Sequence, residues 1–208
     1  GADTRFDIGR FFARGDAGLS LFFVISGFLV VRPFFAAQYG SGTPSIRSYY
    51  RHRAGRILPG YWAALLILFA VSALVTLTAD GRYVDGRPSA RGLLSLATFA
   101  HTLRGSSAIE GISQAWSLGV EVCFYAFVPL LALVLRRRSG AAAVSPSRRG
   151  WLRNQQVLLS LGLIALGTLW RFGVALAKPS WGGSAIYWLP TYLDIFAGGM
   201  LMAAVSVA

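Results

Sequence analysis

The sequence predicts an all-α protein, built as a bundle of membrane-spanning helices. Of its 208 residues, 55% are hydrophobic and 13% are charged, and the mean hydropathy is +0.56. The charged share is about half that of a typical soluble domain. The apolar residues also gather in segments of about 20 residues, the helix length that crosses the hydrocarbon core of a bilayer. These observations indicate a polytopic membrane protein and exclude a soluble binding module.

Five apolar segments are long enough to span a membrane. They comprise residues 18–35, 58–78, 116–135, 157–177 and 186–207. A shorter apolar stretch, 93–100, is expected to lie at the interface or to re-enter the membrane. Small residues interrupt two of the spans, with Ser26 and Gly27 in the first and Gly198, Gly199 and Ala203 in the last. Such residues allow two helices to approach closely, so we expect helix packing at these positions.

The basic residues predict the orientation of these spans. The chain carries 20 Lys and Arg against 8 Asp and Glu, and 11 of the basic residues lie in two regions without any acid, 32–57 and 136–156. The positive-inside rule places such regions in the cytoplasm, and the stretch 79–115 then faces outward. We therefore expect a multi-pass protein of the plasma membrane with a basic cytoplasmic loop at 136–156. Nucleic acid is not an expected partner, because the basic charge is divided among loops and forms no single patch.

One acid stands inside an otherwise apolar span. Glu121 lies within 116–135, where a carboxylate costs about 2.5–3.5 kcal/mol on membrane-insertion scales. Ser117, Glu121 and Tyr125 recur at intervals of four residues and therefore share one face of a helix. We expect this face to carry a functional site, since an ionisable residue inside a membrane span marks one by default. A purely structural role for Glu121, in holding helices together, is the alternative.

Two further charges, Arg171 and Asp194, fall inside the fourth and fifth spans. Charged groups in a membrane pair with one another or face a polar interior, so we expect an ion pair between Arg171 and one of the two intramembrane acids. A pair that only joins helices is the alternative. The single cysteine, Cys123, and the distant His52 and His101 cannot assemble a metal site, so no metal is expected.

Three motifs resemble those of one family. Residues 18–29 (GLSLFFVISGFL) look like its GVxLFFVxSGFL helix, and residues 49–59 (YYRHRAGRILP) resemble its FxxRRxxRIxP loop. Residues 114–121 (QAWSLGVE), followed by Phe124, Tyr125 and Pro129, are similar to its WSLxxExxFYxxxP helix. A weaker likeness, to FxxGMLL, covers residues 196–201. The family is the membrane acyltransferase family 3, which O-acylates sugars and other hydroxyl compounds.

The resemblance implies about ten spans in the full-length protein and five in this chain. It implies an enzyme that transfers an acyl group, acetyl or longer, from acyl-CoA to a hydroxyl of a carbohydrate, glycolipid or similar acceptor. Arg53 and Arg56 match the family's RxxR pair, which would contact the CoA phosphates. A guanidinium suits that role because it binds phosphate through two parallel hydrogen bonds.

The resemblance also implies a catalytic histidine on a helix upstream of 18–35, and neither His52 nor His101 matches its position. We therefore expect the chain to be part of a longer protein and to lack this general base itself. Two alternatives to an active enzyme remain. One is an inactive, truncated acyltransferase, and the other is a polytopic transporter.

Overall fold

The computed structural model describes residues 15–42, 44–78, 90–100, 115–138, 145–178, 185 and 187–207. The main helices are α2 (Gly15–Ala37), α3 (Ile46–Thr78), α4 (Ala90–Ala97), α5 (Ala115–Arg138), α6 (Pro146–Ala177) and α8 (Leu189–Val207). The expected outer stretch at 79–89 and 101–114, the middle of the basic loop at 139–144, and Ile186 lie outside the described residues.

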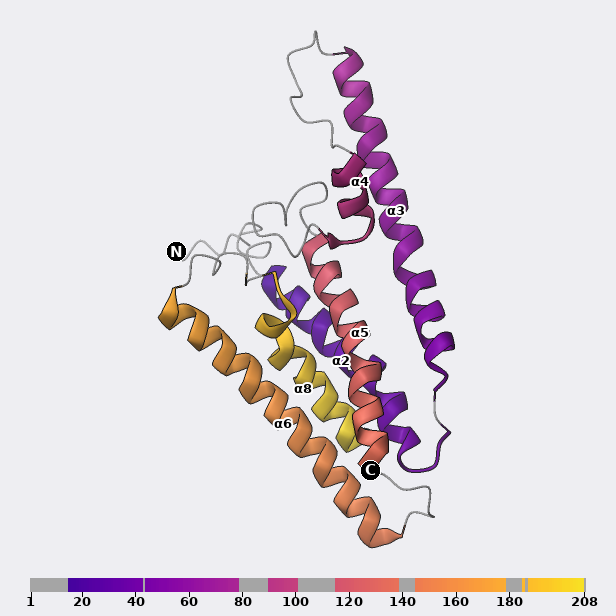
Figure 1. The fold of residues 1–208 in the computed structure, drawn as a ribbon, viewed down its shortest axis with the longest axis vertical. Helices are drawn as coiled ribbons and strands as arrows, with labels where there is room; N and C mark the ends of the chain where they lie inside the picture. Colours follow the sequence, from indigo (N-terminus) through magenta and orange to yellow (C-terminus); the bar gives the residue numbers. More distant parts are fainter. Residues whose placement is uncertain are drawn as a thin grey trace, which may run out of the picture.

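The helices form a packed group with one outlying member (Figure 1). Helix α8 packs along α2 on one side and α6 on the other, and α5 contacts both α2 and α8. Helix α3 stands apart from this group, with the short α4 beside it. Residues of α3 and α5 that face each other line part of the candidate functional site.

Five of these helices are long and apolar enough to cross a membrane, which confirms the predicted fold class. They cover Ala17–Ala37, Ile46–Val71, Ala115–Leu133, Pro146–Ala177 and Leu189–Val207. Helices α2 and α5 end, and α3 and α6 begin, at the same end of the molecule (Figure 1). The described parts of both acid-free regions lie at this end. The chain is a multi-pass membrane protein whose helices alternate as the charges predicted.

Two helices begin earlier than the apolar segments indicated. Helix α3 starts twelve residues before the expected 58, and α6 starts at Pro146 instead of 157, so the basic loop expected at 136–156 is largely helical. Local capping explains the α6 boundary. Ser145 accepts a hydrogen bond from the Arg148 N–H at 3.4 Å, and Pro146 occupies the first turn. Charged residues lower the hydropathy of a segment, but arginine is a good helix former, so the helices continue beyond the apolar core.

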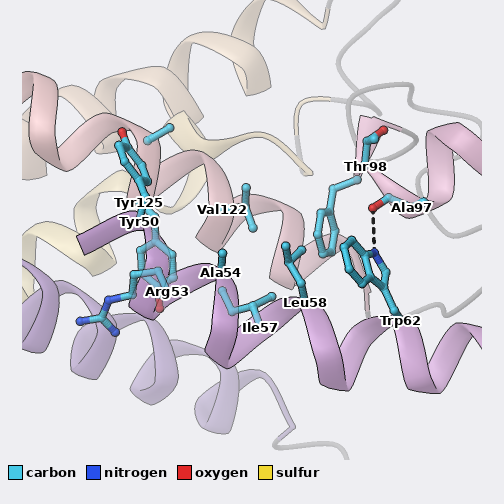
Figure 2. Close-up of a pocket in the computed structure, with 12 residues that line it drawn as sticks. Tyr50, Arg53, Ala54, Ile57, Leu58, Trp62, Ala97, Thr98, Val122 and Tyr125 are labelled. Carbon is cyan, nitrogen blue, oxygen red and sulfur yellow. Dashed lines mark hydrogen bonds between the residues drawn. The ribbon is translucent and has the colours of Figure 1, made fainter. Parts of the chain in front are cut away.

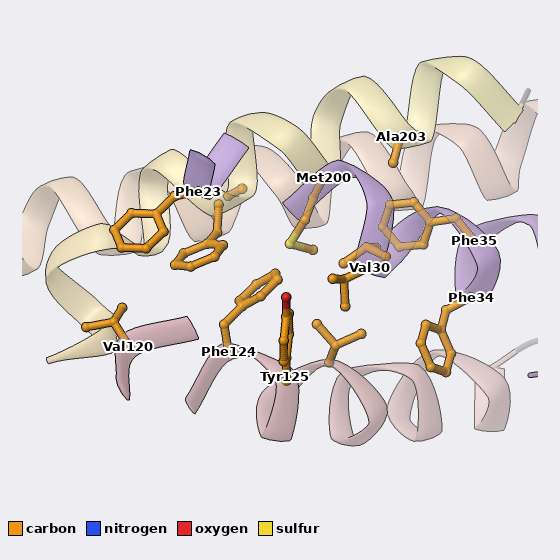
Figure 3. Packing of buried hydrophobic residues seen from close by; sticks show 14 residues of the cluster. Phe23, Val30, Phe34, Phe35, Val120, Phe124, Tyr125, Met200 and Ala203 are labelled. Atoms are coloured by element: carbon orange, nitrogen blue, oxygen red, sulfur yellow. The ribbon is translucent and has the colours of Figure 1, made fainter. Parts of the chain in front are cut away.

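The largest buried cluster lies between α2, α5 and α8 (Figure 3). Its centre is a run of stacked rings in which Phe196 lies between Phe23 and Phe124, with centroid separations of 4.6 and 4.0 Å. Lipid tails are as apolar as these side chains, so close van der Waals packing, more than removal from water, holds such helices together. The rings therefore fix how α5 and α8 meet α2.

Two glycines set the distance between α2 and α8. A Cβ atom added at Gly199 would lie 2.0 Å from the carbonyl oxygen of Val24, and one at Gly27 would lie 2.1 Å from that of Phe196. No real side chain tolerates contact this short with backbone. The expected small-residue packing is present at Gly27 and Gly199, whereas a Cβ at Gly198 would meet nothing within 4 Å.

An ion pair joins α6 to α8. Arg171 donates through Nη2 to Oδ2 of Asp194, which confirms the expected pairing. The Asp194 side chain is 12% exposed and that of Arg171 is 45% exposed. Gly167, one turn before Arg171, allows the approach, because a Cβ there would lie 2.7 Å from the Asp194 amide nitrogen. The carboxylate is thus held against α6 in a largely buried position.

Removing the cation should destabilise the bundle more than removing both charges. Arg171→Ala leaves the carboxylate of Asp194 unpaired in a poorly hydrated setting, so we expect a loss of about 1–3 kcal/mol, below the 3–5 typical of fully buried pairs because Arg171 is half exposed. The double variant with Asp194→Ala should recover part of this loss. Thermal unfolding of the purified protein in detergent measures both. A double variant less stable than Arg171→Ala would contradict this explanation.

Candidate functional site

The carboxylate of Glu121 is buried at the junction of α2 and α5. Its side chain is 3% exposed, and it accepts a hydrogen bond from Ser26 Oγ on α2 at 2.7 Å. It also accepts a hydrogen bond from the hydroxyl of Tyr125, one turn further along α5. Hydroxyl donors of this kind replace the water that a carboxylate loses inside a membrane. The polar face predicted on this helix therefore lies inside the bundle.

The two oxygens of this carboxylate are not equivalent. Both hydroxyls donate to Oε1, whereas no side chain or backbone group in the described ranges donates to Oε2. A carboxylate oxygen has two lone pairs, so Oε2 retains its capacity to accept a proton or a hydrogen bond. Within the described residues, Glu121 is therefore held through one of its two carboxylate oxygens.

A cation lies against the same tyrosine. The guanidinium of Arg53, on α3, lies 5.1 Å from the centre of the Tyr125 ring and 6.0 Å from that of Tyr49. These separations suit a cation–π contact. Tyr49 in turn donates its hydroxyl to the backbone carbonyl of Tyr125 at 3.1 Å. Arg53 therefore points toward α5, and the positive charge stands near the Glu121–Tyr125 pair.

An apolar groove extends from this point between α3, α4 and α5 (Figure 2). Its volume of about 390 Å³ lies within the range of small-molecule sites, about 300–1,000 Å³. Arg53, Tyr50 and Tyr125 lie at one end, and Trp62, Ala97 and Thr98 lie at the other. Between them the walls are apolar, formed by Ala54, Ile57, Leu58 and Val122. We call this space the α3–α5 groove.

The structure brings together some of the residues predicted from sequence and separates others. Glu121, Tyr125 and Arg53 form one connected group. Ser117 lies one helical turn before Glu121 and is half-buried. Arg56 is exposed on α3 and does not line the α3–α5 groove. The predicted roles of all five residues remain predictions, but only Arg53 of the arginine pair stands beside the buried acid.

Sequence reasoning missed two members of the site. The sequence pattern predicts helix packing at Ser26, whereas its hydroxyl donates to Glu121 across 95 positions of sequence. A hydroxyl beside a glycine in an apolar span was the available signal. Tyr49 lies in the basic region, and nothing in its local pattern pointed to a carbonyl on α5.

Comparison with known proteins assigns the chain to a family. A family model described as an acyltransferase domain matches residues 2–207, nearly the whole chain. The chain belongs to the acyltransferase 3 family. The resemblance drawn from the three motifs is thereby confirmed.

A curated protein is also similar to most of this chain. The chain is 29% identical over 223 residues to Nodulation protein 10 of Rhizobium leguminosarum bv. viciae. The alignment covers 91% of this chain and 58% of that protein, so the chain spans less than two thirds of its relative's length. No solved structure matches the chain.

Proposed function

We propose that the full-length protein transfers an acyl group from acyl-CoA to a hydroxyl of a carbohydrate, glycolipid or similar acceptor at the plasma membrane. The observation that carries this proposal is the buried carboxylate of Glu121, bound at one oxygen and open at the other. Family membership supplies the reaction class, acyl transfer. The acyl-CoA donor and the hydroxyl acceptor are the proposal's own choices, taken from the family resemblance.

The reaction needs a base near an attacking hydroxyl. The acceptor oxygen forms a bond to the thioester carbonyl carbon, the carbon–sulfur bond breaks, and the hydroxyl proton passes to the departing CoA sulfur. A group positioned to carry this proton contributes about 10²–10⁴-fold to the rate. In our proposal Glu121 binds the acceptor hydroxyl or orients the base through Oε2, while Tyr125 and Ser117 provide hydrogen bonds around it.

The donor requires positive charge as well. CoA carries phosphates, and a guanidinium is the side chain best suited to bind them. We propose that Arg53 and Arg56 contribute to binding of the CoA donor, and that Arg53 contributes more because it lies beside Tyr125 and the α3–α5 groove.

Replacing these arginines separately tests their roles. We expect Arg53→Ala to raise the KM for acetyl-CoA by more than about tenfold, since charge-assisted hydrogen bonds contribute about 1.5–3 kcal/mol. Arg56→Ala should raise it by less. Arg51→Ala, an exposed arginine of the same helix outside the RxxR pair, is the matched control and should leave KM nearly unchanged. Equal effects at all three positions would show that only the overall basic charge matters.

A direct assay tests the proposed function. The full-length gene product, reconstituted in lipid nanodiscs, is incubated with radiolabelled acetyl-CoA and glycan or glycolipid fractions of the host envelope. Mass spectrometry should then find an acetyl ester on an acceptor hydroxyl, absent from a parallel sample with Glu121→Gln. If no fraction acquires label from acetyl-CoA or from a longer acyl-CoA such as hexanoyl-CoA, or if the label is independent of the protein, the proposal is wrong.

A further inference from the structure

We propose that the α3–α5 groove binds the acyl chain of the donor, so that the protein accepts chains longer than acetyl. The inference rests on the proposed function, because it assumes an acyl-CoA donor. It adds the donor's chain length and the surface that selects it, which neither family membership nor the buried carboxylate specifies.

The residues that line the groove suit the thioester group and the acyl chain of a donor. The only charged side chain among its lining residues is that of Arg53, at one end. The walls beyond it, Ala54, Ile57, Leu58 and Val122, offer no charge and no side-chain hydrogen-bond group. A molecule that fits has a polar end that accepts hydrogen bonds beside Arg53 and a linear apolar tail, and the thioester end of an acyl-CoA has both.

The far end of the groove is closed by contacts between α3 and α4. Trp62 donates through Nε1 to the Ala97 carbonyl at 3.2 Å, and Tyr61 donates its hydroxyl to the Leu96 carbonyl at 2.8 Å. The rings of Tyr61 and Phe99 stack with centroids 4.2 Å apart. These contacts fix α4 against α3 at the end of the groove that is lined by Trp62.

The length of the groove favours a chain of several carbons. Arg53 and Trp62 are nine residues apart on α3, a distance of about 13 Å at 1.5 Å per residue. An acetyl group fills only a small part of this length. A longer acyl chain lying along α3 covers the remaining apolar surface.

The groove also meets the proposed catalytic group. Tyr125 lines its polar end and donates to Glu121 from the same side chain. A chain that lies in the groove with its tail toward Trp62 therefore has its carbonyl end near Tyr125. This is where the thioester must be for a hydroxyl bound near Glu121 to attack it.

Binding of a donor series tests the inference. We would measure the Kd of acetyl-, butyryl- and hexanoyl-CoA for the full-length protein in nanodiscs, at concentrations where each is monomeric. Each methylene buried in an apolar site tightens binding by up to about fourfold. Hexanoyl-CoA should bind more than tenfold tighter than acetyl-CoA. Equal affinities would overturn the acyl-chain assignment.

A filled groove should abolish this preference. Ala54 is an exposed, small residue in the wall, so Ala54→Phe places a ring in the groove without disturbing buried packing. We expect it to remove most of the hexanoyl advantage. Ala64→Phe, on the same helix, exposed and outside the groove, is the matched control and should retain the wild-type preference. A full hexanoyl advantage in Ala54→Phe, or its loss in both variants, would contradict the proposal.

Cross-linking of the wild-type protein gives an answer that no variant can confound. An acyl-CoA with a diazirine at the end of a six-carbon chain should label peptides from the α3–α5 groove, and excess hexanoyl-CoA should displace it. Label elsewhere, or label that hexanoyl-CoA cannot displace, would show that the groove holds membrane lipid or nothing specific. If acetyl-CoA serves as donor while chain length has no effect, this inference fails and the proposed function stands. If no acyl-CoA binds or reacts, both fail.

Discussion

Glu121→Gln in the full-length protein is expected to lower acyl transfer by at least about a hundredfold while the protein still inserts and folds. Glutamine has nearly the same shape, and its carbonyl oxygen can accept the hydrogen bonds that Ser26 and Tyr125 now donate to Oε1. It cannot accept a proton, and it has no negative charge with which to orient a protonated base. Loss of one group that handles a proton costs about 10²–10⁴-fold in rate. The measurement is the turnover of acetyl-CoA per folded protein in nanodiscs.

The companion variants separate catalysis from structure. Ser26→Ala removes one donor to Oε1 but leaves the Tyr125 hydrogen bond and the charge, so its effect should be smaller, about tenfold, the lower end of the range for a lost bond to a charged group. Cys123→Ala, on the same helix but outside the hydrogen-bonded group, should turn over at the wild-type rate. Wild-type turnover by Glu121→Gln would remove the acid from the mechanism. An unfolded Glu121→Gln protein would instead assign it a structural role.

The fold class followed from the sequence because lipid imposes one strong rule. Backbone groups in a membrane must bond within their own segment, so five long apolar stretches could form only helices. The same reasoning misplaced the helix starts. Hydropathy marks the part of a helix that lies in lipid, whereas the caps at Ser45 and Ser145 determine where the helix begins. The apolar segment and the helix that contains it therefore begin at different residues.

The site was only partly visible in the sequence, for a similar reason. Spacing of four residues identified Glu121 and Tyr125 as neighbours, because that contact is local to one helix. Glu121 and Ser26 are 95 positions apart in sequence, and Arg53 and Tyr125 are 72 apart, so both contacts join different helices. No periodicity encodes such contacts. They depend on how α2, α3 and α5 pack, and the groove between α3 and α5 exists only through that packing.

The close contact of α2 and α8 leads to the largest expected effect on stability. Gly199→Ala should destabilise the bundle by about 3 kcal/mol or more, at or above the upper end of the range for overpacked cores. The reason is the position of the new Cβ, 2.0 Å from the Val24 carbonyl oxygen and 2.7 Å from the Phe28 amide nitrogen. Both atoms belong to backbone, so no side chain can rotate away and the two helices must separate. Reversible unfolding in mixed micelles, followed by loss of helix, measures the change.

Gly198, the neighbouring residue, provides a closely matched control. Gly198→Ala adds the same methyl group one residue earlier on the same helix, where nothing lies within 4 Å, and should be neutral or stabilising by up to about 1 kcal/mol through helix propensity. Gly27→Ala, which meets the Phe196 carbonyl at 2.1 Å from the opposite helix, should match Gly199→Ala. Combining Gly27→Ala with Gly199→Ala should cost less than the sum of the two, because one separation of α2 from α8 relieves both clashes. Equal stability of the Gly198 and Gly199 variants would show that the two helices do not meet through their backbones, and the stacked rings of Phe23 and Phe196 would then have to hold them.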